Sequence, residues 1–212
     1  MSTQQPNTLT AQEQAEGWRP LFDGTTVTGW RGFTTATPPA GWQAVDGALV
    51  RAGAGGDLMT VEEFGDFELT LDWKIGAGGN SGIMFHVTTA GTQPYETGPE
   101  LQVLDNAGHA DGKAAETSAG ANYALHAPVR DVTRPVGEWN SIRLIVRGAH
   151  VEHWMNGVKV LDYELWSPDW TARVKASKFN AWSGYGRAAR GHLVLQDHGD
   201  RVWYRNIRIK QM

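Results

Sequence analysis

The sequence contains no cysteine, so disulfide bonds and thiol catalysis are excluded, and cysteine usage leaves the cellular compartment open. It also lacks any apolar run long enough to cross a membrane. The first sixteen residues are polar and carry no signal-peptide pattern. As written, the chain is therefore expected in the cytoplasm, and a periplasmic or secreted location is expected if an export signal has been removed.

An excess of charge of one sign is missing too. The chain carries 19 Lys and Arg against 23 Asp and Glu, a net charge of −4, and the two signs are interspersed. This mixture argues against the basic surface of a nucleic-acid-binding protein and against a membrane-binding face. We therefore expect neither nucleic acid nor a membrane as a partner, while the oligomeric state stays open.

Long segments with the period of an α-helix are absent as well. One short helix is expected within residues 9–16, where Thr10 is a candidate N-cap and Glu13 follows three residues on. Short alternating strands dominate: residues 67–75 alternate strictly, and Asn156-Gly157 between two apolar runs indicates a two-residue hairpin. This pattern predicts an all-β fold, an antiparallel sandwich or jelly roll.

The chain length suits a single sandwich domain, and neither an internal repeat nor an interdomain linker is evident. We expect a polar N-terminal extension over residues 1–16 and one domain over residues 17–212. Two irregular stretches, residues 105–122 and 180–190, interrupt the strands. Loops of this length in a small domain are usually functional, and we expect them to wall an open sheet face.

Glu100 and Gln102 share one face of an expected strand, because Leu101 and Val103 occupy the alternate positions. If the apolar pair enters the core, the polar pair faces the open side of the sandwich. A second carboxylate in register is missing, since position 102 is an amide and Asp105 has the opposite parity. Retaining glycosidases need two carboxyls ~5 Å apart, so an ordinary double-displacement glycosidase is disfavoured.

Further polar and aromatic residues are candidates for the same face. The polar candidates are Asn80, His153, Lys178, Gln196 and His198. Gln196 and His198 share the parity opposite to Leu193 and Leu195, so both can lie on a polar face. A lone histidine is more often structural, but several polar groups that converge favour a binding or catalytic site. The aromatic candidates, which could stack on a pyranose ring, are Trp154, Trp182 and Tyr185.

A divalent cation is the weakest of the candidate ligands. Asp105, Asn106, His109 and Asp111 stand close together in one loop and could supply oxygen ligands to calcium. No paired-histidine or Glu-rich motif accompanies them, so a polar turn is the better interpretation. We therefore assign no metal ligand and no certain cofactor from the sequence.

An ordered set of short segments spans nearly the whole chain, from about Gly17 to Met212. The segments are Gly17-Trp18, Leu21-Phe22-Asp23-Gly24, Gly29-Trp30, Asn80-Ser81-Gly82-Ile83, Pro99-Glu100-Leu101-Gln102, Glu138-Trp139-Asn140, His153-Trp154-Met155-Asn156-Gly157, Ser177-Lys178-Phe179, 191–199 and 204–210. Together they resemble the 3-keto-disaccharide hydrolase domain, long known as a domain of unknown function. The resemblance implies a concanavalin-like fold of two curved antiparallel sheets. It also implies a carbohydrate substrate already oxidised at C3.

The implied chemistry is coherent with the residues present. A ketone at C3 acidifies the C2 hydrogen, so the C1 leaving group can depart by elimination and water can add back. This route needs a base, donors to the enolate oxygen and an acid, but no second carboxylate. We expect Glu100 or His153 to be the base and Lys178, with Gln196 or His198, to stabilise the enolate. His198 or a water molecule then protonates the leaving oxygen.

Two other functions remain open at this stage. A non-catalytic carbohydrate-binding module on the same fold would show an aromatic stripe and few titratable groups, and this chain has both kinds of residue. A conventional glycoside hydrolase of the laminarinase-like type is disfavoured by Gln102. The stacking candidates and the amides Asn80, Gln102 and Gln196 would bind sugar in either kind of protein.

Overall fold

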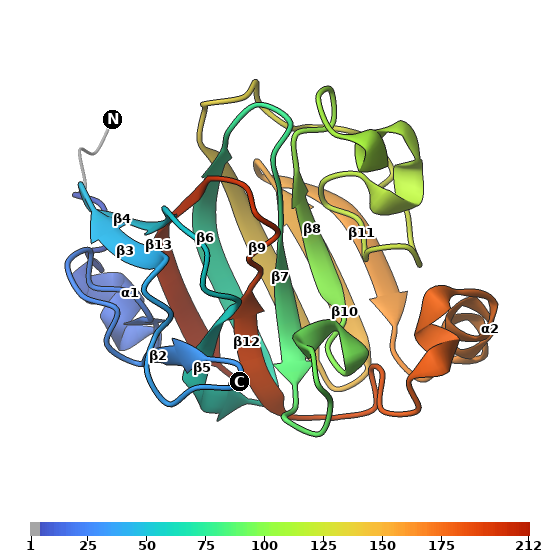
Figure 1. The fold of residues 1–212 in the computed structure, drawn as a ribbon. Helices are drawn as coiled ribbons and strands as arrows, with labels where there is room; N and C mark the ends of the chain where they lie inside the picture. Colours follow the sequence, from blue (N-terminus) through green and yellow to red (C-terminus); the bar gives the residue numbers. More distant parts are fainter. Residues whose placement is uncertain (1–4) are drawn as a thin grey trace.

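The structure, a computed structural model, describes residues 5–212, so the first four residues of the expected extension lie outside the described part. Within these described residues thirteen strands form two sheets, drawn in Figure 1. The larger sheet has the order β11 (Val158–Glu164), β10 (His150–Met155), β9 (Asn140–Arg147), β6 (Phe67–Ile75), β13 (Val202–Gln211), β4 (Ala48–Arg51) and β3 (Trp42–Val45), with β1 (Arg19–Pro20) paired to β13. The smaller sheet has the order β2 (Trp30–Gly32), β5 (Leu58–Phe64), β12 (Gly191–Leu195), β7 (Asn80–Val87) and β8 (Glu100–Leu104).

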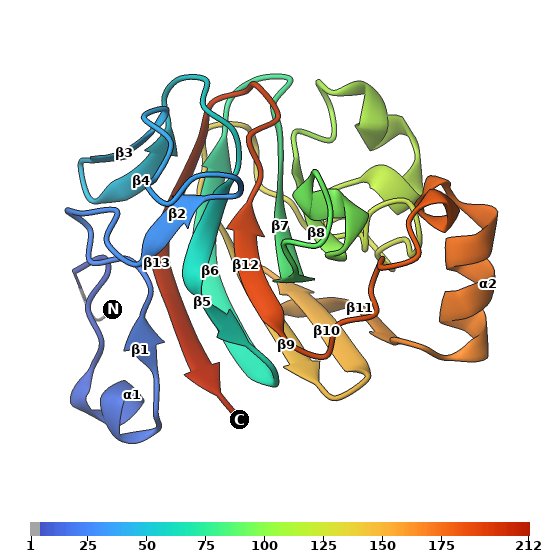
Figure 2. The same ribbon diagram turned by 60° about the horizontal axis from the view of Figure 1, so that its bottom comes forward.

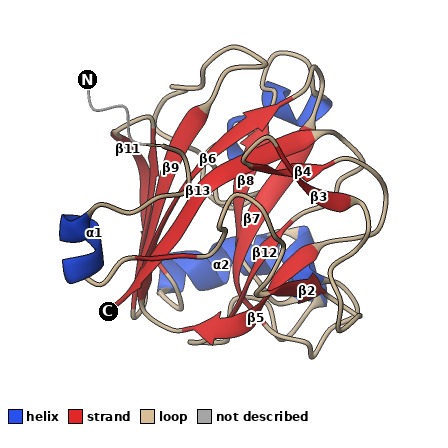
Figure 3. Ribbon diagram, turned by 90° about the vertical axis from the view of Figure 1, so that its left-hand side faces the viewer, coloured by secondary structure: helices blue, strands red, loops and turns tan. Residues whose placement is uncertain are grey.

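The two sheets form a sandwich, which confirms the predicted fold class. Every strand pairing within the described residues is antiparallel. In the side view of Figure 3, β11 and β9 lie to the left of β8, β7 and β12, so the two layers face one another. Non-consecutive neighbours such as β6 beside β13 show that the chain crosses repeatedly between distant parts of the sheets.

The core lies between the sheets and follows from the alternation in the sequence. In β6 the apolar residues, from Phe67 to Ile75, are each at most 2 % exposed, while the polar residues between them face outward. Ile83 and Phe85 of β7 enter the same core from the smaller sheet. Full burial of one such side chain contributes roughly 1.5–3 kcal/mol, so the alternation fixes which face of each strand is inside.

A bulge interrupts the regular strand alternation of β13. Its register against β6 shifts between Arg205 and Arg208, and Asn206 has a positive φ of 55°. Asn206 and Asn7 exchange hydrogen bonds between backbone N–H and side-chain oxygen, at 2.7 and 2.8 Å. The bulge therefore anchors the N-terminal segment against the larger sheet.

The helices are short and lie at the edges of the sandwich, as Figure 2 shows. Helix α1 (Ala11–Ala15) begins at Thr10 with the capping box that the sequence predicts. Helix α2 (Pro168–Ala176) is not expected from the apolar pattern; its signals are Ser167 as N-cap and Pro168 in the first turn. No helix among residues 5–212 is both long and apolar enough to span a membrane.

The two irregular stretches are folded rather than open. Residues 105–122 contain two short 3-10 helices, η2 (Ala110–Lys113) and η3 (Ala115–Thr117). The stretch after α2 begins with the 3-10 helix η4 (Lys178–Ala181), and η1 (Pro94–Glu96) precedes β8. Residues of η1 and η4 line a pocket on the outer face of the smaller sheet, and η3 is hydrogen-bonded to Gln102 beside it.

Candidate active site

A pocket of about 150 Å³ lies on the outer face of the smaller sheet, at β7 and β8. We call it the sheet pocket. Its lining residues are Asn80, Tyr95, Glu100, Gln102, Tyr123, Lys178, Phe179, Gln196 and His198. Six of them are residues that the sequence singles out, three as catalytic candidates and three as substrate-binding amides. The larger pockets near Trp73, near Trp154 and near Trp30 contain none of the candidate catalytic residues.

Glu100 owes its position to a glycine on the neighbouring strand. In the antiparallel pair of β7 and β8, Gly82 lies opposite Gln102 and Met84 opposite Glu100. A Cβ atom on residue 82 would lie only 1.9 Å from Glu100 Oε1, so the carboxyl occupies the space that any other side chain would fill. The glycine in the Asn80-Ser81-Gly82 motif is therefore required by the site.

The environment of the Glu100 carboxyl disfavours its charged form. The residue is 5 % exposed, and beside it Met84 and Val194 belong to a small buried apolar cluster on the same sheet face. Burial raises the pKa of Glu100 to about 8, the charge of Lys178 opposes this shift, and the charges of Asp57 and Asp111 add to it. Glu100 is therefore a carboxyl that exchanges a proton near neutral pH.

Lys178 brings a positive charge to the opposite wall of the pocket. It begins η4, where the Ser177 hydroxyl accepts a hydrogen bond from Phe179 N at 3.2 Å. Lys178 Nζ lies 4.6 Å from the Tyr123 ring centroid and 5.4 Å from that of Phe179. Lys178 forms no ion pair with any acidic residue in the described chain, so its ammonium remains available to an oxygen in the pocket.

Three side-chain amides complete the polar lining. Asn80, Gln102 and Gln196 each have a buried oxygen that receives no hydrogen bond from the described residues. Gln102 Nε2 donates to Thr117 O at 3.3 Å, which ties the pocket to η3. Buried amides with unused hydrogen-bonding capacity are costly unless a partner is supplied, and sugar hydroxyls both donate and accept.

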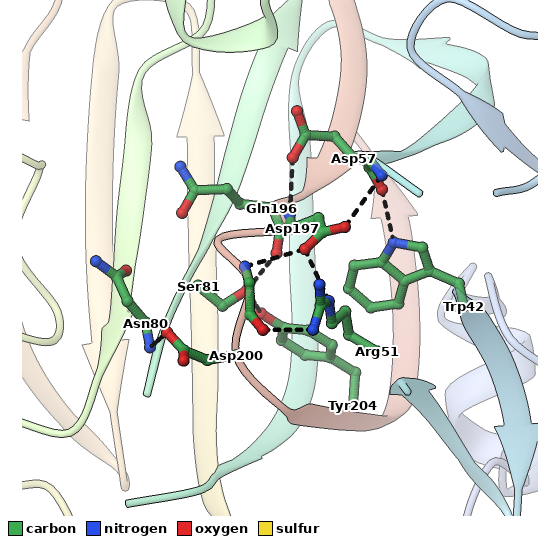
Figure 4. Close-up of polar contacts among 11 residues, drawn as sticks. Trp42, Arg51, Asp57, Asn80, Ser81, Gln196, Asp197, Asp200 and Tyr204 are labelled. Carbon is green, nitrogen blue, oxygen red and sulfur yellow. Dashed lines mark hydrogen bonds and ion pairs between the residues drawn. The ribbon is translucent and has the colours of Figure 1, made fainter. Parts of the chain in front are cut away.

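The loop that carries Gln196 and His198 is held by a polar network, shown in Figure 4. Asp197 forms an ion pair with Arg51 at 2.7 Å, accepts from Gly56 N at 3.0 Å, and donates its own N–H to Asp57 Oδ1 at 2.7 Å. Ser81 Oγ donates to Gln196 O at 2.7 Å. Both members of the ion pair are largely buried, so the network fixes residues 196–198 beside β7.

His153 does not belong to the site, contrary to the expectation. It is fully buried between the sheets, because it shares strand parity with the core residues Val151 and Met155 of β10. Its Nδ1 hydrogen-bonds to Gly120 O at 3.0 Å, and its Nε2 lies 3.3 Å from the Tyr163 hydroxyl. Burial lowers the pKa of His153 to about 4, so the residue is a neutral structural histidine.

Trp154, expected from the sequence to stack on a sugar, also lies apart from the sheet pocket. Its position next to His153 places it on the outer face of the larger sheet, on the opposite side of the sandwich. There its Nε1 donates to Glu152 Oε2 at 2.6 Å, and Arg143 lies over its ring at 5.7 Å from the centroid. The residue therefore contributes to the outer surface and not to the sheet pocket.

The aromatic residues of the second irregular stretch support the pocket from behind. Tyr185 is buried and stacks on Phe179 at 4.0 Å between ring centroids, so it cannot offer a free face to a sugar. Trp182 is half-buried and packs edge-on against Tyr95 at 5.5 Å. The rings that do line the pocket belong to Tyr95, Tyr123 and Phe179, and none of them is among the stacking candidates from the sequence. Only the placement of Tyr123 directly after the loop 105–122 gives a signal for it.

The loop residues considered as calcium ligands make contacts within the loop and with its neighbours. Asp105 accepts hydrogen bonds from Gly78 N and Ala107 N, at 2.7 and 3.1 Å. Asp111 Oδ2 accepts from the Tyr123 hydroxyl at 3.1 Å, and burial with that carboxylate nearby raises the pKa of Tyr123 to about 12. Among residues 5–212 no three His, Asp or Glu gather as a metal-binding group.

Comparison with known proteins identifies the class of protein. The sequence model of the 3-keto-alpha-glucoside-1,2-lyase-like domain matches residues 17–210. The chain belongs to this family. It is 35 % identical over 228 aligned residues to a 3-keto-disaccharide hydrolase of Bacteroides thetaiotaomicron, with 92 % of this chain and 79 % of that protein covered.

Solved structures agree with this placement. A proposed glycosyl hydrolase from Parabacteroides distasonis superposes with a TM-score of 0.91 at 39 % identity, covering 98 % of this chain and all of the other. The carbohydrate-binding module CBM66 of Bacillus subtilis superposes with a TM-score of 0.55 at 13 % identity, covering 87 % and 96 % of the two chains. The second likeness concerns the fold alone.

Proposed function

We propose that this protein cleaves 3-keto-disaccharides and related 3-keto-glycosides by elimination at the glycosidic bond followed by addition of water. The observation that carries the proposal is the pairing of one buried carboxyl, Glu100, with a lysine that has no acidic partner in the described chain, inside a pocket lined by amides. Membership of the family and the identity to a 3-keto-disaccharide hydrolase support the same substrate class.

The roles follow from what each group can do. Glu100 removes the C2 proton, because it is the only carboxyl among the residues described as lining the sheet pocket and its raised pKa makes it a stronger base when ionised. Lys178, with Gln196 or His198, stabilises the negative charge that develops on the C3 oxygen. The leaving oxygen then takes a proton, and the same groups guide water to C1 in the second half of the reaction.

A sugar-binding module without catalysis is the second candidate, because its fold is represented by CBM66. It requires polar and aromatic contacts but no proton transfer. The two functions differ in Glu100: a binding module has no need of a carboxyl that must be buried beside a lysine. An enzyme that transfers protons does need a buried carboxyl of shifted pKa, so the placement of Glu100 beside Lys178 favours the enzyme.

The test is product analysis of the purified protein with a 3-keto-disaccharide and with its unoxidised parent, each with and without EDTA. The proposal expects cleavage of the keto substrate alone. Binding without cleavage would establish the sugar-binding module instead, and cleavage of the parent would establish a conventional glycosidase. Loss of activity with EDTA, restored by calcium, would show that the loop 105–122 or another site binds a required ion.

A further inference from the structure

Asp57 lies on the same outer sheet face as the pocket, two strands away from Gly82. Leu58 pairs with Leu195 and Leu195 with Ile83, so the next row across β5, β12 and β7 contains Asp57, Gln196 and Gly82. Leu58 points into the core and is fully buried, so the residue before it points outward. Strands are spaced by about 4.8 Å, which puts the Asp57 backbone roughly 10 Å from the glycine covered by the Glu100 carboxyl.

Only one oxygen of the Asp57 carboxyl forms a hydrogen bond with the described residues. Its Oδ1 accepts from Asp197 N at 2.7 Å, the dashed line drawn to the carboxyl in Figure 4, and its other oxygen makes no hydrogen bond with the described residues. Asp57 forms no ion pair within the described chain, because Arg51 pairs with Asp197. Burial, with the Asp197 charge, raises the pKa of Asp57 to about 6, and Asp57 in turn raises that of Glu100.

The size and lining of the pocket indicate on which side of it the second ring of a bound disaccharide lies. A volume of about 150 Å³ suits one sugar ring rather than two, so the other ring of a disaccharide must lie outside. Lys178, Phe179 and Tyr123 close the side beyond β8. On the opposite side the lining ends at Gln196, and Asp57 is the next residue in that row. The leaving sugar is therefore expected to extend over β12 toward β5.

Resting on the proposed function, we propose that Asp57 is the proton donor to the leaving oxygen. The reacting form has Glu100 ionised and Asp57 protonated, which is the minor of the two singly protonated forms, because the pKa is about 8 for Glu100 and about 6 for Asp57. In this form Glu100 takes the C2 proton, and the C–H electron pair forms the enolate of the C3 ketone. Return of the enolate electrons forms the C1–C2 double bond and expels the C1 oxygen, which takes the Asp57 proton. In the second half Asp57 accepts a proton from the water that adds to C1, while Glu100 returns its proton to C2, so both carboxyls are restored.

The test compares two leaving groups in the Asp57→Asn variant. A 3-keto-disaccharide expels a basic alkoxide that needs a proton, whereas a 4-nitrophenyl 3-keto-glucoside expels a stable phenolate that does not. The amide introduced at position 57 keeps an oxygen to accept from Asp197 N. Asp57→Asn is expected to lose roughly 10²–10⁴-fold in kcat on the disaccharide but only a few-fold on the nitrophenyl substrate. Glu100→Gln should lose activity on both, because both reactions begin with C2 proton removal.

Two control variants separate this role from a structural one. Asp197→Asn weakens the same loop without touching the Asp57 carboxyl, so it should affect both substrates alike; His198→Ala tests the other candidate donor. Equal loss on both substrates in Asp57→Asn, or leaving-group dependence in His198→Ala instead, would overturn the assignment of Asp57 alone. Wild-type protein that leaves both keto substrates intact would overturn the proposed function and the Asp57 role with it.

Discussion

Glu100 illustrates how one residue can be costly to the fold and useful to the site. Its carboxyl is buried over Gly82, beside an apolar cluster, and its nearest opposite charge is a lysine that leaves it without a salt bridge. A carboxyl in such a place resists ionisation, and this resistance is what makes it basic once ionised. Substitution of Glu100 should therefore affect both the activity and the pH dependence of stability.

Replacement of Glu100 by Gln should remove activity on a 3-keto-disaccharide by roughly 10²–10⁴-fold while the fold is retained, because the amide cannot accept the C2 proton. Activity is measured by product formation and the fold by circular dichroism. The matched control is Glu63→Gln, an exposed change at the far end of β5, which should leave turnover unchanged. Wild-type rates in Glu100→Gln would contradict its role as the base.

The same substitution should change stability in a pH-dependent way. The folded pKa of Glu100 is about 8, raised from an ordinary value of 4.5, so the folded state holds a proton that the unfolded chain releases. The resulting stability is fully present below pH 4.5 and is lost as the pH rises toward about 8. Glu100→Gln should therefore be more stable than wild type at about pH 8, by on the order of a few kcal/mol, and nearly equal at about pH 4. Urea denaturation at both pH values tests the sign, and an equal effect at both would contradict it.

Gly82→Ala should reproduce the catalytic loss without unfolding the protein. The three atoms nearest the new Cβ all belong to the flexible side chain of Glu100, so the carboxyl must leave its place while the strand can stay. We expect kcat to fall toward that of Glu100→Gln with little change in thermal stability. Gly65→Ala is the control, because its Cβ would make an ordinary 3.7 Å contact with Ala189 O. Full activity in Gly82→Ala would show that the position of the carboxyl over Gly82 is unimportant.

Residue parity decides how much of this site the sequence could predict. Glu100 and Gln102 are placed correctly because Leu101 and Val103 mark the inward face of their strand. The same rule applied to Val151 and Met155 places His153 in the core, where the structure has it. Asp57 gives no such signal, because it stands before the first paired residue of its strand.

At the scale of elements, the loop of residues 196–200 positions two pocket residues through one buried ion pair. Arg51 and Asp197 have side chains 12 % and 7 % exposed and lie 2.7 Å apart. Removing one partner leaves the other charge buried, which typically costs about 3–5 kcal/mol. Arg51→Met should lower the free energy of unfolding by about that amount and raise KM for the keto substrate.

The control for this prediction is an exposed pair on β11. Lys159→Met removes a partner of Asp162 at the surface, where ion pairs contribute ~1 kcal/mol or less. Chemical denaturation and steady-state kinetics of both variants separate the two cases. Equal stability of Arg51→Met and Lys159→Met would mean that the pair does not hold the loop.

Elements built from short-range signals are easier to predict than those fixed by packing. The capping box of α1, the alternation of β6 and the Asn156-Gly157 turn each act within a few residues, and the structure confirms them. Helix α2 has only one buried residue, Trp170, so its sequence shows almost no apolar repeat with the period of a helix. The bulge in β13 depends on a partner 199 residues away, which no local pattern reveals.

At the scale of the molecule, the sandwich separates its two outer faces. The smaller sheet carries the pocket, while the larger sheet turns tryptophans and basic residues outward, such as Trp154 beneath Arg143. The count of ten Trp could not by itself distinguish core, surface and sugar platform. The fold class was predictable because alternation is periodic along the whole chain, whereas the pocket arises from segments that are distant in the sequence and meet only in space.

The measurement that tests the central claim most directly is the fate of the C2 hydrogen during cleavage. A 3-keto-disaccharide deuterated at C2 competes with the unlabelled substrate, and unlabelled substrate is cleaved separately in heavy water, with uncleaved 3-keto-sugar incubated alone as the control. Elimination predicts slower cleavage of the deuterated substrate and deuterium at C2 of the product formed in heavy water. Equal cleavage rates together with a product that retains all of its C2 hydrogen would contradict proton removal by Glu100 and the proposed mechanism.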